Sequence, residues 1–360
     1  MTARLHMIVL LSLLLSATSA YAQQWRQLEP TGTAPTPRNN ASLVYDPVGH
    51  RLIVFAGRSS AGDLNDLWSL DIETLTWTQL HPSGSPPPPR STHNAVYDPA
   101  TQQMLVWSGR LSSVFYNDVW ALDLAQTSWI QFEPEGPVPN TRYGTGAIFD
   151  PSDRQLVTFA GFTDEGRFDD TWTFTPTTST WTNLGLTVNP GRRCLHTASY
   201  DPQRHRMIIY GGQRSGALGD LWSLDLNARV WSELTPAISP EGRTFPASVY
   251  DEHGQRFIIF GGGGANGLKH GDTWSYDFVS GTWEQIALTG TSPIARNGAA
   301  GVYIERESRS LFFGGVGTEV RFNDVWALEG LAPPPPPTAV ETTSWGKIKG
   351  HAAPEANKTQ

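Results

Sequence analysis

The sequence predicts an all-β chain folded as a six-bladed propeller, and three repeating features carry this prediction. An Asp-x-Trp motif recurs six times, with spacings of 52, 52, 50, 52 and 52 residues between its tryptophans. An apolar run that ends in glycine precedes each copy, and a second tryptophan follows five of the six copies, eleven residues after the aspartate. A period of about 50 residues is typical of propellers in which each repeat supplies one four-stranded sheet.

Each repeat also opens with an arginine and carries an aromatic residue seven positions later. The six arginines are Arg38, Arg90, Arg142, Arg193, Arg243 and Arg296. The six aspartates of the Asp-x-Trp motif are Asp66, Asp118, Asp170, Asp220, Asp272 and Asp324. The arginine stands at the start of the first strand expected in its repeat and the aspartate at the start of the third, so both lie at the same end of the sheet. We therefore expect six structural Arg–Asp pairs, one in each blade.

Four short strands, a to d from the inside of the ring outwards, fit within each repeat. Strand a ends at the repeated aromatic residue, strand b is an apolar run such as residues 52–55, strand c carries the Asp-x-Trp motif, and strand d carries the second tryptophan. An unbroken apolar run indicates a strand that is covered on both faces, as happens when each sheet packs between two neighbours.

The sixth repeat lacks the second tryptophan, and the other end of the chain supplies a substitute. Residues 25–28 (Trp-Arg-Gln-Leu) copy residues 77–80 (Trp-Thr-Gln-Leu). Trp25 also precedes Arg38 by the same thirteen residues that separate Trp77 from Arg90. We therefore expect residues 23–29 to form the outer strand of the last blade and to close the ring.

The recurring pattern of Pro-Arg, Tyr-Asp, an apolar run ending in Gly-Gly, and Asn-Asp-x-Trp resembles the Kelch repeat. The resemblance covers residues 25–329 and departs mildly in the first three repeats, where Ala56, Ser108 and Ala160 replace the first glycine. It extends to secreted bacterial-type Kelch proteins and to the central domain of galactose oxidase. The resemblance implies a six-bladed propeller that binds ligands, often peptides, on the face formed by the b–c loops and by the loops from d to the next a.

The two ends of the chain lie outside the repeats, and the first predicts export. Residues 1–22 fit a signal peptide with an apolar stretch over residues 7–15 and cleavage after Ala22, so we expect a secreted or periplasmic protein. Residues 23–330 are the expected propeller, and a run of prolines starts an expected disordered tail over residues 331–360. The single cysteine, Cys194, has no partner for a disulfide within the chain.

Composition narrows the classes of partner. A formal net charge of −8 argues against nucleic acid, whose binding requires a basic surface. No later stretch approaches the ~18–20 apolar residues of a membrane span, so we expect none. We expect a monomer that binds a protein or glycan ligand, and the sequence indicates no cofactor.

Because the strands alternate in direction, the b–c loops and the loops from d to the next a emerge on one face, which we call the arginine face. The b–c loops carry the cations Arg58, Arg110, Arg167, Arg214, Lys269 and Arg321. Of these we select Arg58, Arg110, Arg214 and Arg321 as candidates for binding carboxylates of an acidic glycan or peptide. The alternative is that these arginines pair within the protein.

The residues that follow the repeat arginines are expected to point toward the mouth of the central channel. They are Asn39, Asn40, Ser91, Thr92, Tyr143, Cys194, Thr244, Phe245 and Asn297. Converging amide, hydroxyl and aromatic groups suit sugar or peptide recognition, and we select Asn39, Asn40, Tyr143, Phe245 and Asn297 as candidate ligand-binding residues. The same residue types are also ordinary in turns, which leaves a structural role as the alternative.

These features favour a binding module over an enzyme. The loops of the arginine face are short and nearly constant in length, whereas propeller enzymes usually carry lids and extra catalytic residues in insertions. We therefore assign no catalytic residue. The alternative is a carbohydrate-active enzyme such as a sugar epimerase or mutarotase, which should place a carboxylate or histidine with a shifted pKa in the channel.

The resemblance to galactose oxidase leaves one minor alternative, a copper oxidase. Its residues would be His93, Tyr143, Cys194 and His196, which lie near the starts of successive inner strands. No ligand set that matches galactose oxidase aligns here, so we predict no metal site.

Overall fold

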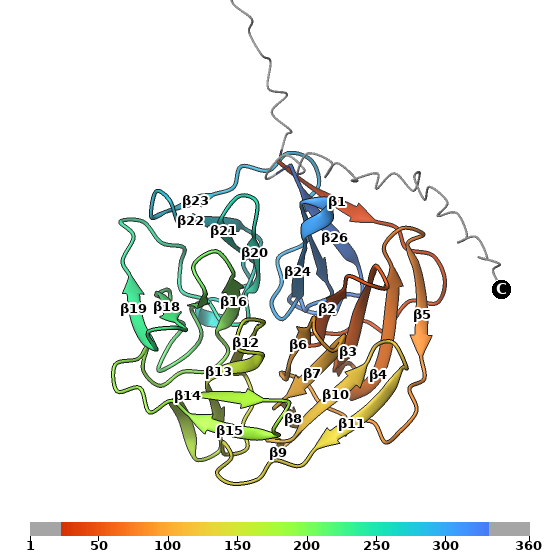
Figure 1. The fold of residues 1–360 in the computed structure, drawn as a ribbon. Coiled ribbons are helices and arrows are strands. Elements are labelled where there is room, and N and C mark those ends of the chain that lie inside the picture. The colour runs from red at the N-terminus through yellow and green to blue at the C-terminus, as the bar shows by residue number, and fades with distance from the viewer. Residues whose placement is uncertain (1–22, 331–360) are drawn as a thin grey trace, which may run out of the picture.

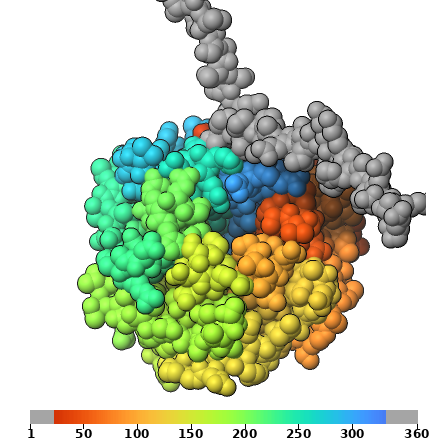
Figure 2. Space-filling model, in the orientation of Figure 1, coloured from red at the N-terminus to blue at the C-terminus, as the bar shows by residue number. Residues whose placement is uncertain are grey.

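The structure is a computed structural model that describes residues 23–330, so the expected signal peptide and proline-rich tail lie outside the described residues. Residues 23–330 form six four-stranded antiparallel sheets arranged in a ring around a central axis (Figure 1). The space-filling view shows the blades as consecutive colour sectors (Figure 2). The predicted all-β, six-bladed propeller is confirmed.

The strands of each blade follow one another from the axis outwards. Blade one contains β2 (Ser42–Asp46), β3 (Arg51–Ser59), β4 (Gly62–Asp71) and β5 (Thr76–Leu80). Blade two contains β6 (Asn94–Asp98), β7 (Gln103–Trp107), β10 (Val119–Asp123), β11 (Ser128–Phe132) and the small hairpin β8 (Arg110–Leu111) and β9 (Val114–Phe115). Blade three contains β12 (Gly146–Asp150), β13 (Gln155–Thr163), β14 (Gly166–Thr175) and β15 (Thr180–Asn183).

The second half of the ring repeats this order. Blade four contains β16 (Thr197–Asp201), β17 (Arg206–Tyr210), β18 (Leu221–Asp225) and β19 (Val230–Leu234). Blade five contains β20 (Ala247–Asp251), β21 (Arg256–Phe260), β22 (Thr273–Asp277), β23 (Thr282–Gln285) and the 3-10 turn η1 (Ala265–Gly267). Blade six contains β24 (Ala300–Ile304), β25 (Arg309–Phe313), β26 (Val325–Glu329) and the 3-10 turn η2 (Glu305–Glu307).

The N-terminal strand β1 (Gln24–Leu28) completes blade six, as predicted. It lies beside β26 (Figure 1) and pairs with it antiparallel. The register places Trp25 opposite Leu328. Trp25 is only 4% exposed, and its ring packs edge-on against Phe260 and Phe312 with centroid distances of 5.0 Å. The strand therefore both supplies the missing edge of the sheet and fills the space between blades five and six.

The core lies between neighbouring blades and follows from the apolar runs of strand b. Successive residues of β3 point to opposite faces of their sheet, and residues 52–56 are fully buried. Leu52 and Val54 pack against blade six, whereas Ile53 and Phe55 pack against blade two. A strand covered on both sides needs apolar residues at every position, which is why these runs do not alternate.

Each inner strand runs from the arginine face to the opposite face, which we call the tyrosine face because the repeated Tyr-Asp turns lie there. In blade one, Asp46 accepts hydrogen bonds from the amides of Val48 and Gly49 and pairs with Arg51 at 2.9 Å. Such a turn satisfies its own backbone locally. The two faces of the disc thus carry different chemistry, and each end of the central channel can be considered separately.

Candidate ligand-binding face

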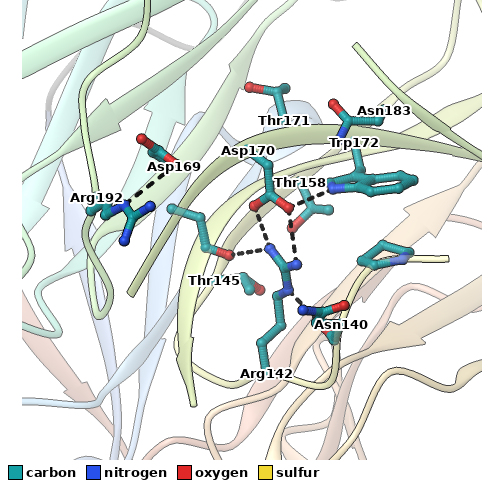
Figure 3. A network of polar contacts seen from close by, with 12 residues as sticks. Asn140, Arg142, Thr145, Thr158, Asp169, Asp170, Thr171, Trp172, Asn183 and Arg192 are labelled. Carbon is teal, nitrogen blue, oxygen red and sulfur yellow. Dashed lines mark hydrogen bonds and ion pairs between the residues drawn. The ribbon is translucent and has the colours of Figure 1, made fainter. Parts of the chain in front are cut away.

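The repeat arginines all lie beneath the arginine face, and each contacts the aspartate of its own blade. In blade three, Arg142 donates to both carboxylate oxygens of Asp170, at 2.5 and 3.0 Å, and to the carbonyl oxygens of Asn140 and Ala160 (Figure 3). The indole N–H of Trp172 donates to the same carboxylate at 2.7 Å. The six arginines are at most 2% exposed. Their hydrogen-bonding groups therefore face the protein rather than a ligand.

Three of these aspartates have a pKa that favours their charged form. Burial by itself raises the pKa of Asp66, but the hydrogen bonds and charge of Arg38 outweigh it and hold the pKa below its usual value. Asp220 beside Arg193 and Asp272 beside Arg243 show the same balance. A bidentate pair between a buried guanidinium and a carboxylate fixes the third strand of the blade against the start of the first.

A closed ring of backbone hydrogen bonds links all six blades at this end of the channel. We call its members the collar: Asn40, Thr92, Gly144, Leu195, Phe245 and Gly298. Each collar amide donates to the carbonyl oxygen of the collar residue in the preceding blade, over 2.7–3.1 Å. Every collar residue has a positive φ, between 51° and 64°, which glycine adopts freely at two of the positions and the other four adopt under constraint. The collar therefore fixes the blades relative to one another.

A cavity of about 120 Å³ lies at the collar, and its lining divides the predicted mouth residues into two groups. Asn40, Thr92 and Phe245 line it, as expected. Asn39, Tyr143 and Asn297 do not, because the residue directly after each repeat arginine forms a bridge to the b–c loop instead. Ser91, Cys194 and Thr244 follow the same geometry. Successive side chains in an extended segment point in opposite directions. The sequence did not show whether the first or the second residue after each repeat arginine points toward the axis.

Two histidines on the inner strands also line this cavity. Burial lowers the pKa of both His93 and His196 to about 3, so both rings are neutral. The Nε2 of His93 lies 2.9 Å from the Ser42 hydroxyl, and both ring nitrogens of His196 lack a protein partner. A cavity of this size has room for about four water molecules, which can satisfy such groups.

The b–c loops place one cation in each blade, but not at equivalent positions. Arg58 and Arg110 follow the glycine of strand b, Arg167, Lys269 and Arg321 lie on the returning arm of the loop, and Arg214 lies near its tip. Arg58 pairs with Asp63 at 3.2 Å, whereas Arg321 donates to the amide oxygen of Asn39 and Arg214 to two backbone carbonyls. Only one of the four selected arginines therefore has a carboxylate partner within the described residues.

Between blades two and three, two of these loops and the residue after Arg142 form a cluster of aromatic rings and cations, which we call the rim cluster: Arg110, Phe115, Tyr143, Phe162 and Arg167. Tyr143 stacks on Phe115 with a centroid distance of 5.5 Å and meets Phe162 edge-on at 5.6 Å. The guanidinium of Arg110 lies 4.6 Å from the Tyr143 ring, and that of Arg167 lies 5.4 Å from the Phe162 ring. All five residues are partly exposed, and neither arginine forms an ion pair within residues 23–330.

The sequence analysis selected Arg110 and Tyr143 and missed the aromatic residues of the rim cluster. Phe162 occupies the position that Gly263 holds in blade five, and Phe115 the position of Lys269. An aromatic residue at such a loop position was a visible signal, because a solvated turn does not require one.

Metal ligation finds no support in the described part of the chain. Within residues 23–330, no three side chains of His, Cys, Asp or Glu come together as a possible metal site. His93 and His196 are the buried neutral residues described above, and Cys194 is buried with its thiol pKa raised by burial. We therefore do not propose a copper site. The same residues also contain no helix long and apolar enough to cross a bilayer.

Comparisons with known proteins agree with this architecture. The family model of the KLHDC2/KLHL20/DRC7 Kelch-repeats domain matches residues 14–191 and 187–349. Human Kelch domain-containing protein 3 is 28% identical over 214 residues, which cover 55% of this chain and 53% of that protein. Acyl-CoA-binding domain-containing protein 5 of Arabidopsis thaliana is 33% identical over 125 residues, or 34% of this chain and 19% of that protein.

The chain thus spans about half or less of the length of these relatives, so the comparison concerns the propeller and not the whole relatives. The family match covers both halves of the ring, and each of its six blades carries the same buried Arg–Asp–Trp network. This chain belongs to the Kelch-repeat family.

Proposed function

We propose that this propeller is a binding module that recognises an acidic segment of a partner protein on the arginine face, at the rim cluster. The observation that carries the proposal is the exposed set of stacked aromatic rings flanked by Arg110 and Arg167, neither of which has a carboxylate partner in the described chain. Kelch-repeat propellers typically serve as protein-interaction modules, which supports a protein as the ligand.

The physical argument concerns both charge and shape. Tyrosine and arginine are enriched at the energetic centres of protein interfaces, because a rigid ring buries a large area at a low entropy cost. A guanidinium stacked on a ring keeps its hydrogen-bonding edge free for a carboxylate. Asp164 and Glu165 lie in the same loop as Arg167 but form no ion pair with it, so the site stays open to an external carboxylate.

The test uses a fluorescent peptide of ten glutamates, with a glutamine peptide of equal length as the neutral control. Changing Arg110 and Arg167 together to Gln should weaken binding of the glutamate peptide by about tenfold or more, because two charge-assisted contacts are lost. The matched control changes Arg26 and Arg229 to Gln, which removes the same charge away from the b–c loops. Equal affinity of the two double variants would contradict the proposal.

A third probe separates the two classes of ligand. Polygalacturonate presents carboxylates on a glycan, and we expect it to bind more weakly than the glutamate peptide. Tighter binding of the glycan, lost in the Arg110/Arg167 variant, would show that the arginine face takes an acidic carbohydrate instead.

A carbohydrate-active enzyme is the second candidate, and one observation favours it. Glu252 lines the other end of the channel, and burial raises its pKa to about 7, which suits proton transfer near neutral pH. NMR of a panel of reducing sugars tests it, because a mutarotase would speed interconversion of the anomers and Glu252→Gln would abolish the effect. We place this candidate second because no histidine or cation lines that cavity to assist such a reaction.

We also propose that the protein acts outside the cytoplasm, on the basis of the pattern in residues 1–22. N-terminal sequencing of protein recovered from the periplasm or culture medium should begin at Gln23. Recovery only from the cytoplasm, with Met1 retained, would contradict export.

A further inference from the structure

The opposite end of the channel contains a second and larger cavity. It has a volume of about 600 Å³, opens on the tyrosine face, and is lined by residues of all six inner strands. These strands surround the axis of the ring (Figure 1). Its walls include the repeated aromatic residues Tyr45, Tyr97, Phe149, Tyr200, Tyr250 and Tyr303. This volume falls within the range of about 300–1,000 Å³ that is usual for small-molecule sites.

The repeat is broken at the mouth of this cavity in two adjacent blades. In the first four blades the turn after the inner strand carries a proline that lines the mouth: Pro47, Pro99, Pro151 and Pro202. Blades five and six carry Glu252 and Glu305 at the same place. Proline suits this position because its fixed φ favours a turn, so the turn itself does not explain a glutamate.

These two glutamates differ from the neighbouring aspartates in whether an ion-pair partner compensates their charge. The repeated aspartates are each buried against an arginine or a histidine, in the pairs Asp46–Arg51, Asp98–Arg154, Asp150–His205, Asp201–Arg206 and Asp251–Arg256. Glu252 and Glu305 form no ion pair within residues 23–330, and no Lys, Arg or His lines the cavity. Arg306 is exposed and interacts with Tyr45. The mouth therefore carries negative charge that nothing in its lining compensates.

Glu252 is also sensitive to pH. Its partial burial, and then the charges of Glu305, Asp251 and Asp201, raise its pKa to about 7. Tyr200 lies close enough for Glu252 to contribute to the raised pKa of its hydroxyl. A positive charge placed beside Glu252 would favour the ionised carboxylate. Binding of a cation would therefore release a proton.

We propose that the tyrosine-face cavity binds a small organic cation, whose ammonium group pairs with Glu252 and Glu305 while its carbon frame packs against the ring of tyrosines. Aromatic faces attract ammonium groups, and carboxylates supply the opposite charge. A metal ion fits less well, because Ca²⁺ takes about 6–8 oxygen ligands and the described residues bring no three acidic, His or Cys side chains together. The ammonium group belongs either to a free amine or to a lysine side chain.

The experiment titrates the purified chain with cadaverine, a five-carbon diamine, and with the uncharged diol of the same length. Calorimetry at about pH 8 should detect cadaverine binding and no diol binding. At about pH 5.5 the affinity for cadaverine should fall about tenfold, because Glu252 is then protonated. Acetyl-lysine-methylamide, which carries a free side-chain ammonium group, distinguishes the two sources. Tighter binding of this compound indicates a lysine side chain, and tighter binding of cadaverine indicates a free amine.

Variants make the test specific. Glu252→Gln should remove the pH dependence, and Glu252→Gln combined with Glu305→Gln should weaken cadaverine binding about tenfold or more. Glu73→Gln, in an exposed turn on the same face, should change nothing. The Arg110/Arg167 variant should bind cadaverine normally, so failure of the arginine-face proposal is distinguishable from failure of this one. Equal binding of diol and diamine, wild-type affinity in the double glutamate variant, or calcium binding lost in that variant would each overturn the proposal.

Discussion

The two ends of the channel are built by the same six repeats, yet they differ in how strictly the repeat is kept. At the arginine face every blade has a buried Arg–Asp pair and one collar residue, so this end is nearly six-fold symmetric. At the tyrosine face the symmetry holds through four blades and fails at Glu252 and Glu305. The difference indicates that repeated residues build the frame, and that departures from the repeat mark where a ligand can be recognised.

The rim cluster follows the same rule. Phe162 occupies a loop position that holds no aromatic residue in the other five blades, and Phe115 occupies one that holds none in the other five. Within residues 23–330, these loops bring three aromatic rings together at blades two and three alone. Loop positions tolerate such differences because they contribute little to the interface between blades. In this repeat protein we therefore expect ligand recognition at residues that depart from the repeat. Three sets of variants test this comparison between the two ends of the channel.

The largest expected effect on stability comes from β1, the strand that closes the ring and so supports both ends of the channel. Deleting residues 23–30 removes β1, opens the edge of β26 and exposes the interface between blades five and six. Trp25→Ala alone should lower the free energy of unfolding by about 3–5 kcal/mol, as other truncations of large buried residues do. Urea unfolding followed by tryptophan fluorescence measures it.

The matched control for this change is Gln27→Ala, which lies in the same strand but is exposed. It should shift stability by less than about 0.5 kcal/mol. If the chain without residues 23–30 is as stable as the chain that begins at Gln23, the ring does not rely on this strand. Some other contact would then have to hold the two ends of the channel together.

A smaller effect should follow from breaking one pair at the arginine face. Asp118→Ala leaves the guanidinium of Arg90, which is fully buried, without its carboxylate. We expect a loss of about 3 kcal/mol, at the lower end for a broken buried pair because Asp118 is 17% exposed. Thermal unfolding followed by circular dichroism measures the loss.

The exposed pair of Arg26 and Glu329 provides the comparison. Its side chains are 47% and 25% exposed, so Glu329→Gln should cost about 1 kcal/mol or less. If Asp118→Ala and Glu329→Gln lose the same stability, a buried repeat pair contributes no more stability than an exposed pair. The repeat pairs would then not be what holds each blade together.

The frame was predictable from the sequence because each of its parts repeats. The Asp-x-Trp spacing determined the number of blades, the copied segment over residues 25–28 located the closing strand, and the shared end of strands a and c brought Arg38 to Asp66. Each inference needed only the period of a strand and the direction of the chain.

The candidate sites were less predictable. The positive φ of Leu195 and Phe245 in the collar is imposed by the ring and not by their own preference, so the side-chain directions beside the repeat arginines could not be assigned. The substitution of Glu252 and Glu305 for proline was visible in the sequence. The sequence did not show that these six turns, which lie far apart along the chain, line one cavity. Only the closed ring brings them together.

The smallest expected effect concerns the tyrosine face and depends on pH. The pKa of Glu252 is raised from 4.5 to about 7 in the folded protein, so the folded state holds more protons than the unfolded state between these values. This group therefore causes stability to decrease as pH rises from about 4.5 to about 7, and its cost remains constant above that range. Glu252→Gln should remove the cost and stabilise the protein by about 1 kcal/mol at about pH 8, a figure reduced for the partial exposure of the carboxyl. Below about pH 4.5 the variant and the wild type should unfold at the same urea concentration.

The control is Glu73→Gln, which changes an exposed glutamate on the same face and should show no difference at either pH. A variant no more stable than the wild type at the higher pH would mean that Glu252 is already compensated, and the contrast between the two ends of the channel would disappear.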